Sequence, residues 1–265
     1  MKADQALDPV MCVTDDHRML SLRCGDDIVA SLAYYTGGSQ HRPHSHEFSQ
    51  LSFLLAGAML ERLEGVEHEL YTAAMGFKPA GCEHEDVWGR QGTLIFSLKL
   101  PAEARGFPSA PGWSWHEHPE TISALVKACL LAPSVAARNE AVGDLLATTD
   151  ARGERFGTHA PSWLEEVRCR INDDPDDAAI EKLADDAGVD RAHLSRAFRR
   201  YYGVPPSVYR RQVLTGRAVQ GVSQQRQCFS AVAANAGFSD QAHMNRTLRS
   251  QIGVSPGQLR RFLCG

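Results

Sequence analysis

The chain carries the run Arg196-Ala-Phe-Arg-Arg-Tyr-Tyr-Gly203-Val-Pro-Pro206-Ser-Val-Tyr-Arg210-Arg211, and fifty residues later it carries Arg246-Thr-Leu-Arg-Ser-Gln-Ile-Gly253-Val-Ser-Pro256-Gly-Gln-Leu-Arg260-Arg261. Seven of these sixteen positions are identical. A repeat at one fixed spacing usually indicates a supersecondary unit that is used more than once. Two copies are too few for a solenoid, so the sequence predicts a tandem pair of small modules.

The residues ahead of the first copy have the pattern of a helix-turn-helix. Ile180, Leu183 and Ala184 would share one apolar face of a helix. Gly188 can adopt the positive φ that a tight turn between two helices needs, and Asp190 can cap a second helix. The first unit is therefore predicted over residues 180–201.

The residues ahead of the second copy repeat this pattern. Phe229, Val232 and Ala233 would line the first helix, and Gly237-Phe238 would form the turn. Ser239 or Asp240 would then cap the second helix. The second unit is therefore predicted over residues 229–251.

Charge separates sharply within the same region. Residues 191–265 contain twelve Arg, no Lys and one acid, Asp240, which gives a balance of +11. Residues 161–190 contain ten acids against three basic residues, a balance of −7, and the whole chain carries −4. A basic stretch with helix-turn-helix patterns is typical of a protein that binds duplex DNA. Arginine without lysine also favours bidentate contacts to phosphate groups and guanine edges.

Over about residues 161–262 this part of the chain resembles the DNA-binding domain of the AraC/XylS family of bacterial transcription regulators. The motifs that carry the resemblance are Leu183-Ala184, Leu194-Ser-Arg196-x-Phe198-Arg199, Gly203-Val-x-Pro206-x-x-Tyr209, Ala233-x-x-x-Gly237-Phe238-Ser-Asp-Gln241 and Arg246-x-x-x-x-x-x-Gly253-Val-Ser-Pro256. The resemblance implies seven helices, with a long central helix at about residues 206–222 joining the two units. It also implies sequence-specific binding to double-stranded DNA, an activator role with RNA polymerase as a partner, and a place in the bacterial cytoplasm at the nucleoid.

The resemblance also assigns DNA-contacting positions on the second helix of each unit. Positions opposite the apolar face of that helix are Arg191, Ala192, Ser195, Arg196 and Arg199 in the first unit, and Gln241, Ala242, Asn245, Arg246 and Arg249 in the second. Arg199, Arg210, Arg249 and Arg260 are expected to contact phosphate groups. Gly216 and Gly221 depart from the family pattern, and each costs a helix interior about 1 kcal/mol relative to Ala. This cost makes the spacing between the two units less rigid than the family pattern implies.

The N-terminal part of the chain has the pattern of an antiparallel barrel. Strands are expected at residues 28–35, 48–55, 58–63, 66–71 and 93–100, each bounded by glycine-containing turns. Strands at this spacing without intervening helices favour a barrel or a sandwich. The expected fold class is thus a two-domain β + α chain with an antiparallel β-barrel, a helical segment and an all-α tandem helix-turn-helix domain. The domains are placed at residues 1–120, 121–148 and 161–265, with a linker at 149–160.

Composition sets further limits. Residues 1–9 contain no apolar signal core, and the longest apolar run, residues 51–60, is too short to span a bilayer. No membrane partner is therefore expected. Seven scattered cysteines without a Cys-x-x-Cys spacing suit a reducing cytoplasm better than a disulfide framework.

One group of residues in the expected barrel could bind a small molecule. His44, His46 and Gln50, followed downstream by His84, resemble the two motifs of the cupin family, in which three histidines converge inside a barrel. Alternate residues of a strand point the same way, so His44 and His46 can share one face. Gln50 stands where metal-binding cupins have Glu, and Trp88 stands where an Asn often closes the second motif. The preferred occupant is a small organic effector bound by His44, His46, Gln50, His84 and Trp88, and the alternative is a divalent metal held by His44, His46 and His84.

Two helices are expected at residues 121–132 and 135–148. Their apolar faces contain Ile122, Leu125, Val126, Cys129, Val142, Leu145 and Leu146. We expect these faces to form a homodimer seam, since two-fold self-association is the commonest soluble assembly. The alternative is that the two helices only cover the barrel.

Two classes of function remain. The first is a transcription regulator, without enzymatic activity, in which an effector bound by the barrel controls DNA binding. The second is a cupin-type metal-dependent enzyme with a basic helical appendage. Gln50 argues against the second class, because an amide is a poorer ligand than a carboxylate for a hard cation.

Overall fold

The computed structural model describes residues 9–25, 27–71, 74–103, 110–115, 119–148, 160–175, 178–224 and 226–264. Its strands are β1 (Val10–Val13), β2 (His17–Arg23), β3 (Val29–Tyr35), β4 (Gln40–His44), β5 (Ser49–Leu63), β6 (Val66–Tyr71), β7 (Ala74–Lys78), β8 (His84–Leu100) and β9 (Gly112–Trp115). Its helices are α1 (Pro119–Leu131), α2 (Val135–Thr148), α3 (Ser162–Asp173), α4 (Ile180–Asp186), α5 (Arg191–Tyr202), α6 (Pro206–Ser223), α7 (Phe229–Ala236), α8 (Gln241–Ile252) and α9 (Pro256–Cys264). The linker predicted at residues 149–160 lies, except for residue 160, outside the described residues. None of the described helices combines the length and the apolar character that a membrane span requires.

The strands form one antiparallel sheet in the order β1-β2-β3-β8-β5-β7-β9, with β4 beside β8 and β6 beside β5. The strands predicted at 48–55 and 58–63 are one long strand, β5, and the strand predicted at 93–100 is the second half of β8. Both strands are bent where Gly57 and Gly92 take positive φ values of 86° and 72°. A Cβ on Gly57 would lie 2.1 Å from the Gly92 carbonyl oxygen, so only glycine allows this approach. Glycines predicted to end strands therefore bend them instead.

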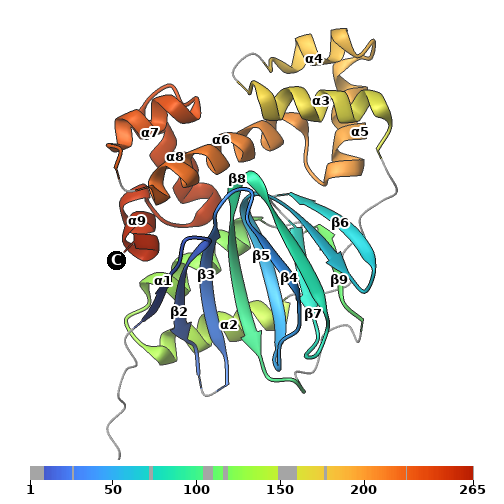
Figure 1. The fold of residues 1–265 in the computed structure, drawn as a ribbon. Coiled ribbons are helices and arrows are strands. Elements are labelled where there is room, and N and C mark those ends of the chain that lie inside the picture. The colour runs from blue at the N-terminus through green and yellow to red at the C-terminus, as the bar shows by residue number, and fades with distance from the viewer. Residues whose placement is uncertain are drawn as a thin grey trace, which may run out of the picture.

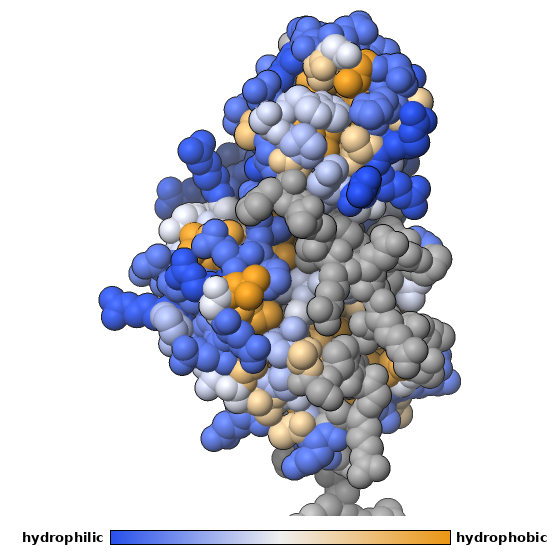
Figure 2. All heavy atoms as spheres, turned by 90° about the vertical axis from the view of Figure 1, so that its right-hand side faces the viewer, coloured by the Kyte–Doolittle hydropathy of each residue, from blue (hydrophilic) through white to orange (hydrophobic). Residues whose placement is uncertain are grey.

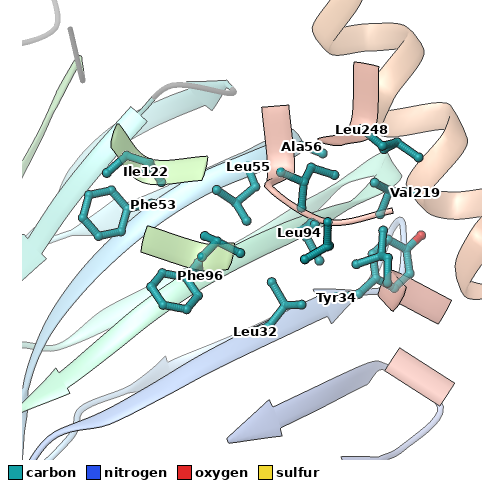
Figure 3. Close-up of a cluster of buried hydrophobic side chains, with 14 of the residues drawn as sticks. Leu32, Tyr34, Phe53, Leu55, Ala56, Leu94, Phe96, Ile122, Val219 and Leu248 are labelled. Atoms are coloured by element: carbon teal, nitrogen blue, oxygen red, sulfur yellow. The ribbon is translucent and has the colours of Figure 1, made fainter. Parts of the chain in front are cut away.

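The two faces of the sheet bury different side chains. One face is apolar and includes Leu32, Phe53 and Phe96, which pack against Ile122 of α1, as Figure 3 shows. The opposite face encloses a cavity lined by polar side chains, among them Gln50, Ser97 and the three histidines of the cupin-like motifs. This difference follows from the alternation of side chains along β3, β5 and β8.

Helices α1 and α2 cover the apolar face of the sheet, as seen behind the strands in Figure 1. Leu125 and Leu145 are each 4% exposed and lie in the same core cluster as the sheet residues. The apolar faces that we expected to form a homodimer seam are thus already buried within one chain. They are not available to a second copy, and this part of the prediction is corrected in favour of the covering role.

The C-terminal part contains two helix-turn-helix units, with α4 and α5 in the first and α7 and α8 in the second. The carboxylates of Asp190 and Asp240 accept hydrogen bonds from the backbone N–H groups of His193 and His243, at 2.8 and 2.6 Å, and so cap α5 and α8. Helix α6 runs across one end of the sheet and joins the two units (Figure 1). The predicted two-domain β + α fold is confirmed.

The two glycines of α6 have packing reasons. A Cβ on Gly221 would lie 3.0 Å from Val232 of α7, and one on Gly216 would lie 3.0 Å from the Gln91 side chain and 3.4 Å from the Gly57 nitrogen of the sheet. Gly216 thus lets the helix approach the bend of β5. The expected loss of rigidity in α6 is therefore offset by close packing, with both glycines held against neighbouring elements.

The two domains share their cores. Val219 of α6 and Leu248 of α8 belong to the same apolar cluster as the sheet residues Leu32 and Leu94 (Figure 3). Tyr71, the last residue of β6, is 5% exposed and lies inside the core of the first helix-turn-helix unit. The guanidinium of Arg168 in α3 lies 5.0 Å from the centre of the Tyr71 ring and 3.2 Å from Glu69. The N-terminal domain therefore contacts both helix-turn-helix units directly.

Candidate functional site

The structure places the predicted DNA-contacting residues on the outer faces of α5 and α8. Those of α5 are exposed apart from half-buried Ser195, and those of α8 are exposed apart from half-buried Asn245. Leu194, Phe198, Met244 and Leu248 point the other way and are fully buried. Figure 2 shows that the lobe formed by the first unit presents a mostly hydrophilic surface. Each second helix can therefore offer its polar face to DNA.

Two of the expected phosphate contacts are used inside the protein. The Arg260 guanidinium donates to the carbonyl oxygens of Gln227 at 2.9 Å and Val222 at 3.3 Å, and it stacks 4.1 Å from the Phe229 ring centre. The Arg210 guanidinium donates to the Pro175 carbonyl. We therefore reassign both residues to the packing of the C-terminal domain. Arg199 and Arg249 remain exposed.

Arg246 is exposed to solvent and also lines a cavity. Together with His243, Thr247 and Ser250 of α8, it borders a cavity of about 510 Å³ whose other walls come from β5, α1 and α6. Glu120 at the start of α1 also lines this cavity. The second recognition helix is thus in direct contact with the N-terminal domain.

The five residues predicted to bind an effector come together around one cavity of about 210 Å³. The ring of His44 lies 5.0 Å from that of His46 and 4.2 Å from that of His84, centre to centre. Trp88 stacks on Tyr35 at 3.8 Å on the same wall. The register explains the convergence, because His44 and His84 face each other across β4 and β8.

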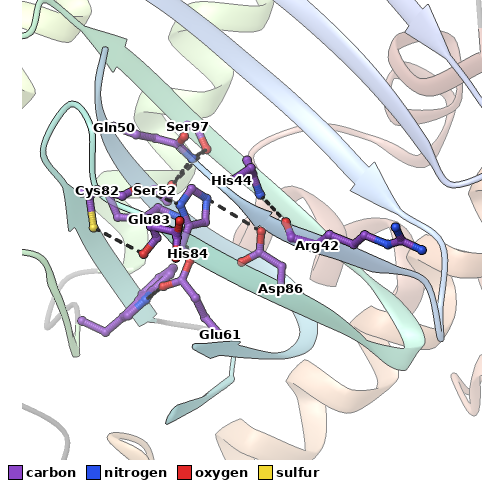
Figure 4. A network of polar contacts seen from close by, with 12 residues as sticks. Arg42, His44, Gln50, Ser52, Glu61, Cys82, Glu83, His84, Asp86 and Ser97 are labelled. Carbon is purple, nitrogen blue, oxygen red and sulfur yellow. Dashed lines mark hydrogen bonds and ion pairs between the residues drawn. The ribbon is translucent and has the colours of Figure 1, made fainter. Parts of the chain in front are cut away.

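Gln50 is hydrogen-bonded to two serines of the cavity wall. Its amide nitrogen donates to the hydroxyls of Ser52 at 2.8 Å and Ser97 at 3.3 Å, and these two hydroxyls lie 3.1 Å apart. Figure 4 shows this group on one side of His84, with Asp86 and Glu61 on the other. The amide nitrogen of Gln50 is therefore held by the two serine hydroxyls.

The sequence analysis missed a charged group in the same cavity. Glu61 is fully buried, and its carboxylate pairs with the Lys78 ammonium at 2.5 Å and accepts a hydrogen bond from the indole of Trp113. Asp86 is buried beside them, with its carboxylate 3.9 Å from Nε2 of His84. Asp86 lies two residues after His84 on the same strand, so the alternation of side chains would have predicted that both lie on one face. The sequence did not indicate that Glu61 and Lys78 form a pair, because their contact depends on the bend of β5.

Burial and neighbouring charges shift several pKa values in the cavity. Burial, and then repulsion by His44 and Lys78, lowers the pKa of His46 to about 4. Burial, and then repulsion by Lys78, lowers the pKa of His84 to about 4. Burial raises the pKa of Asp86 to about 8. At neutral pH His46 and His84 are therefore neutral and Asp86 is mostly protonated.

These shifts predict that the combined contribution of His46, His84 and Asp86 to folding stability passes through a maximum near pH 6.5, the ordinary pKa of histidine. From about pH 4 to 6.5 the unfolded chain binds two protons, at His46 and His84, that the folded chain does not bind, while the folded chain holds one at Asp86. The unfolded chain then binds one proton more, so stability rises with pH. From about pH 6.5 to 8 Asp86 is the one of these three groups that still differs, the folded chain binds more protons there, and this contribution falls. The Cys24 thiol acts in the opposite direction from about pH 7 to 9, because its hydrogen bond with Cys129 lowers its pKa to about 7.

Urea unfolding of chelator-treated protein at several pH values measures this profile. Asp86→Asn removes the titrating carboxyl and keeps its size, so between pH 6.5 and 8 the stability of this variant should increase relative to that of the original chain. The rise from pH 4 to 6.5 should remain and become steeper. A stability difference between the two chains that stays constant from pH 6.5 to 8 would contradict the assignment.

The donor set can be tested for metal binding. The ligand atoms of His44, His46 and His84 lie within 4.8 Å of one another, and so do those of His41, His44 and Asp86. Neutral imidazoles suit zinc, iron or nickel. Lys99 lines the same cavity without an acidic partner among the described residues, however, and its positive charge opposes a cation. The three histidines could hold a metal, but the cavity around them is built for a less positive occupant.

Comparisons with known proteins support the C-terminal assignment. Residues 183–261 match the family model described as a helix-turn-helix domain. No curated protein sequence matches the chain. Among solved structures, ToxT from Vibrio cholerae is 9% identical, with 91% of this chain and 100% of that chain covered and a TM-score of 0.39.

Two further structures match the N-terminal part. KdgF from Halomonas sp. is 23% identical over 36% of this chain and 87% of its own, with a TM-score of 0.33. An RmlC-like cupin from Shewanella frigidimarina is 20% identical over 37% of this chain and 86% of its own, also with a TM-score of 0.33. The chain thus joins an N-terminal antiparallel β domain to a C-terminal helix-turn-helix domain.

Proposed function

We propose that this protein is a sequence-specific transcription regulator whose DNA binding is controlled by a small effector in the cupin-like cavity. The observation that carries the proposal is the pair of capped helices, α5 and α8, whose polar faces are exposed on one chain and joined by the packed helix α6. Arginine is the only strongly basic residue type in this region, which suits recognition of phosphate groups and guanine.

Strands β5 and β8 offer a route from the cavity to the DNA-binding helices. Gln50 and Ser52 face the cavity, while Leu51 and Phe53 on the same strand face the apolar core shared with α1, α6 and α8. A ligand that shifts these strands would therefore move side chains on both faces of the sheet, including those that pack against α1, α6 and α8. An effector can change DNA affinity only through such a difference in contacts between two states.

The finer parts of the proposal are an activator role, contact with RNA polymerase and a homodimer. A dimer would place two copies of the tandem units on repeated half-sites. It would use a surface other than the buried faces of α1 and α2. Sedimentation velocity at micromolar concentration measures this state directly.

The second candidate function is a metal-dependent enzyme of the cupin type, and the cluster of His44, His46 and His84 favours it. The amide of Gln50 in place of a carboxylate and the positive charge of Lys99 in the cavity weigh against it. Metal analysis of the purified full chain separates the two functions. Stoichiometric metal, with no protection of any DNA, would favour the enzyme.

Footprinting tests the proposed function. One protomer should protect two successive major-groove segments about 10 bp apart on one face of the DNA, because its two recognition helices are held by one α6 helix. Operator fragments would first be selected from genomic DNA with the full chain. Protection of a single groove segment would mean that one unit has only a structural role.

A further inference from the structure

Three buried polar atoms around the cupin-like cavity have no hydrogen-bond partner among the described residues. They are Oγ of Ser31, Oδ1 of Asp86 and Nε1 of Trp88, and their residues are only 3%, 4% and 4% exposed. An unpaired polar group in a protein interior costs free energy, so native structures almost always satisfy it. Three such atoms around one cavity indicate that a polar ligand completes their hydrogen bonds.

The three atoms restrict the ligand. The Trp88 indole can only donate, so the ligand must bring an acceptor to it. Ser31 can donate or accept, and Asp86 Oδ1 is an acceptor unless it carries the carboxyl proton. A ligand hydroxyl group meets all of these needs because it both donates and accepts. A metal ion cannot pair with an indole N–H, and a hydrocarbon would leave all three atoms unpaired.

The charges of the cavity restrict the chemistry of the ligand further. Lys78 is neutralised by Glu61, with their charged atoms 2.5 Å apart. Lys99 is half-buried, its ammonium lies 5.0 Å from the centre of the Phe48 ring, and no acidic side chain in the described ranges pairs with it. Burial alone lowers the pKa of Lys99, as expected for a cation without a counter-ion. The cavity therefore has one uncompensated positive group.

Polar groups surround Lys99 on the neighbouring strands. Lys99 faces Gln50 in the register of β8 and β5, and Ser97 faces Ser52 on one side and Ser31 on the other. The serines of three strands thus lie in a row across the sheet, two residues from Lys99 along β8. Asp86 and Glu61 lie on the other side of His84 from this row, as Figure 4 shows. One side of the cavity suits a carboxylate and the other suits hydroxyl groups.

We propose that the cavity binds a small hydroxycarboxylate, with its carboxylate on Lys99 and the serine row and a hydroxyl group between Asp86 and Trp88. This inference rests on the proposed function, of which it names the effector class. The volume of about 210 Å³ is below the usual range for drug-sized ligands, so the molecule is small.

Isothermal titration calorimetry on the full chain tests whether the ligand is a hydroxycarboxylate. The probes are tartrate, gluconate and glucuronate, with glucose as the uncharged match and hexanoate as the match without hydroxyl groups. At least one hydroxy acid should bind, and at least tenfold more tightly than glucose or hexanoate. Lys99→Gln should weaken that binding about tenfold or more, because a charge-assisted contact is lost. Lys182→Gln, at an exposed lysine of α4 outside the cavity, should leave it unchanged.

Other outcomes overturn the proposal. Binding of glucose or hexanoate as tight as that of every hydroxy acid would contradict the class, and so would affinity unchanged in Lys99→Gln. Binding of none of the three acids, with Zn²⁺ alone bound at one equivalent, would give the cavity to a metal. Footprinting on the same preparations keeps the two proposals apart. Intact DNA protection with a failed titration rejects only the effector class, whereas absent protection rejects the proposed function.

Discussion

Replacing Arg196 or Arg246 by alanine should weaken binding to the specific operator by about 5- to 150-fold each. An arginine that reads a base edge through a bidentate contact contributes about 1–3 kcal/mol. Both side chains are exposed on the polar faces of α5 and α8, and their helices are fixed from behind by buried Leu194 and Leu248. Electrophoretic shift assays on selected operator fragments measure the loss. The double variant should approach the affinity for unrelated DNA.

Matched controls separate base reading from general charge. Arg200 lies on the same helix as Arg196, but its guanidinium lies over the ring of Tyr201, 5.8 Å from the ring centre. Arg200→Ala should therefore change operator affinity far less than Arg196→Ala. Arg199→Ala and Arg249→Ala should leave sequence preference unchanged. Each should reduce, by about one, the steepness with which the logarithm of the DNA-binding constant falls with the logarithm of the salt concentration, as expected of phosphate contacts. Equal losses on operator and unrelated DNA in Arg196→Ala would show that this arginine reads no base.

The sequence predicted the C-terminal part well because its signals are local. Asp190 and Asp240 cap helices within three residues, and Gly203 and Gly253 end them with positive φ values of 74° and 91°. Such effects depend on a few neighbouring residues, so pattern and spacing fixed helix bounds to within one residue for α5 and α8. The grouping of His44 and His46 with His84 was predicted from the resemblance to the cupin motifs, and His46 lies two residues past the end of β4, so alternation along a single strand does not explain it.

The contacts between the domains could not be predicted in this way. From the sequence alone, Gly216 is expected to destabilise its helix, and only the close approach of α6 to Gly57 explains why glycine is needed there. The apolar faces around Leu125 and Leu145 predict burial, but not whether the same chain or another one covers them. The pairing of Glu61 with Lys78 joins residues of β5 and β7 that are not partners in the strand register, where Lys78 faces Gln50. These features are set by tertiary packing, which leaves no periodic trace in the sequence.

Tyr71 is where the N-terminal domain contributes to the first helix-turn-helix core. Its ring is 5% exposed and lies 5.9 Å from the ring of Tyr202 and 5.8 Å from that of Tyr209, in edge-on contact with both. Arg168 covers the ring and also pairs with Glu69 and Glu165, at 3.2 and 2.8 Å. Tyr71 is also paired with Ala58 of β5, three residues before the buried Glu61 of the cavity. A short path thus connects the cavity wall to this unit.

Tyr71→Ala should lower the free energy of unfolding by about 3–5 kcal/mol, because it removes a buried ring and leaves a space between the domains. It should also reduce the effect of a bound ligand on operator affinity, since the contact between β6 and the first unit is lost. Tyr71→Phe keeps the ring and removes a hydroxyl that has no hydrogen-bond partner among the described residues, so its stability and ligand response should stay near those of the original chain. Urea unfolding and shift assays with and without ligand measure both effects. A normal ligand response in folded Tyr71→Ala protein would place the coupling elsewhere, with α1 and α8 as the remaining contact.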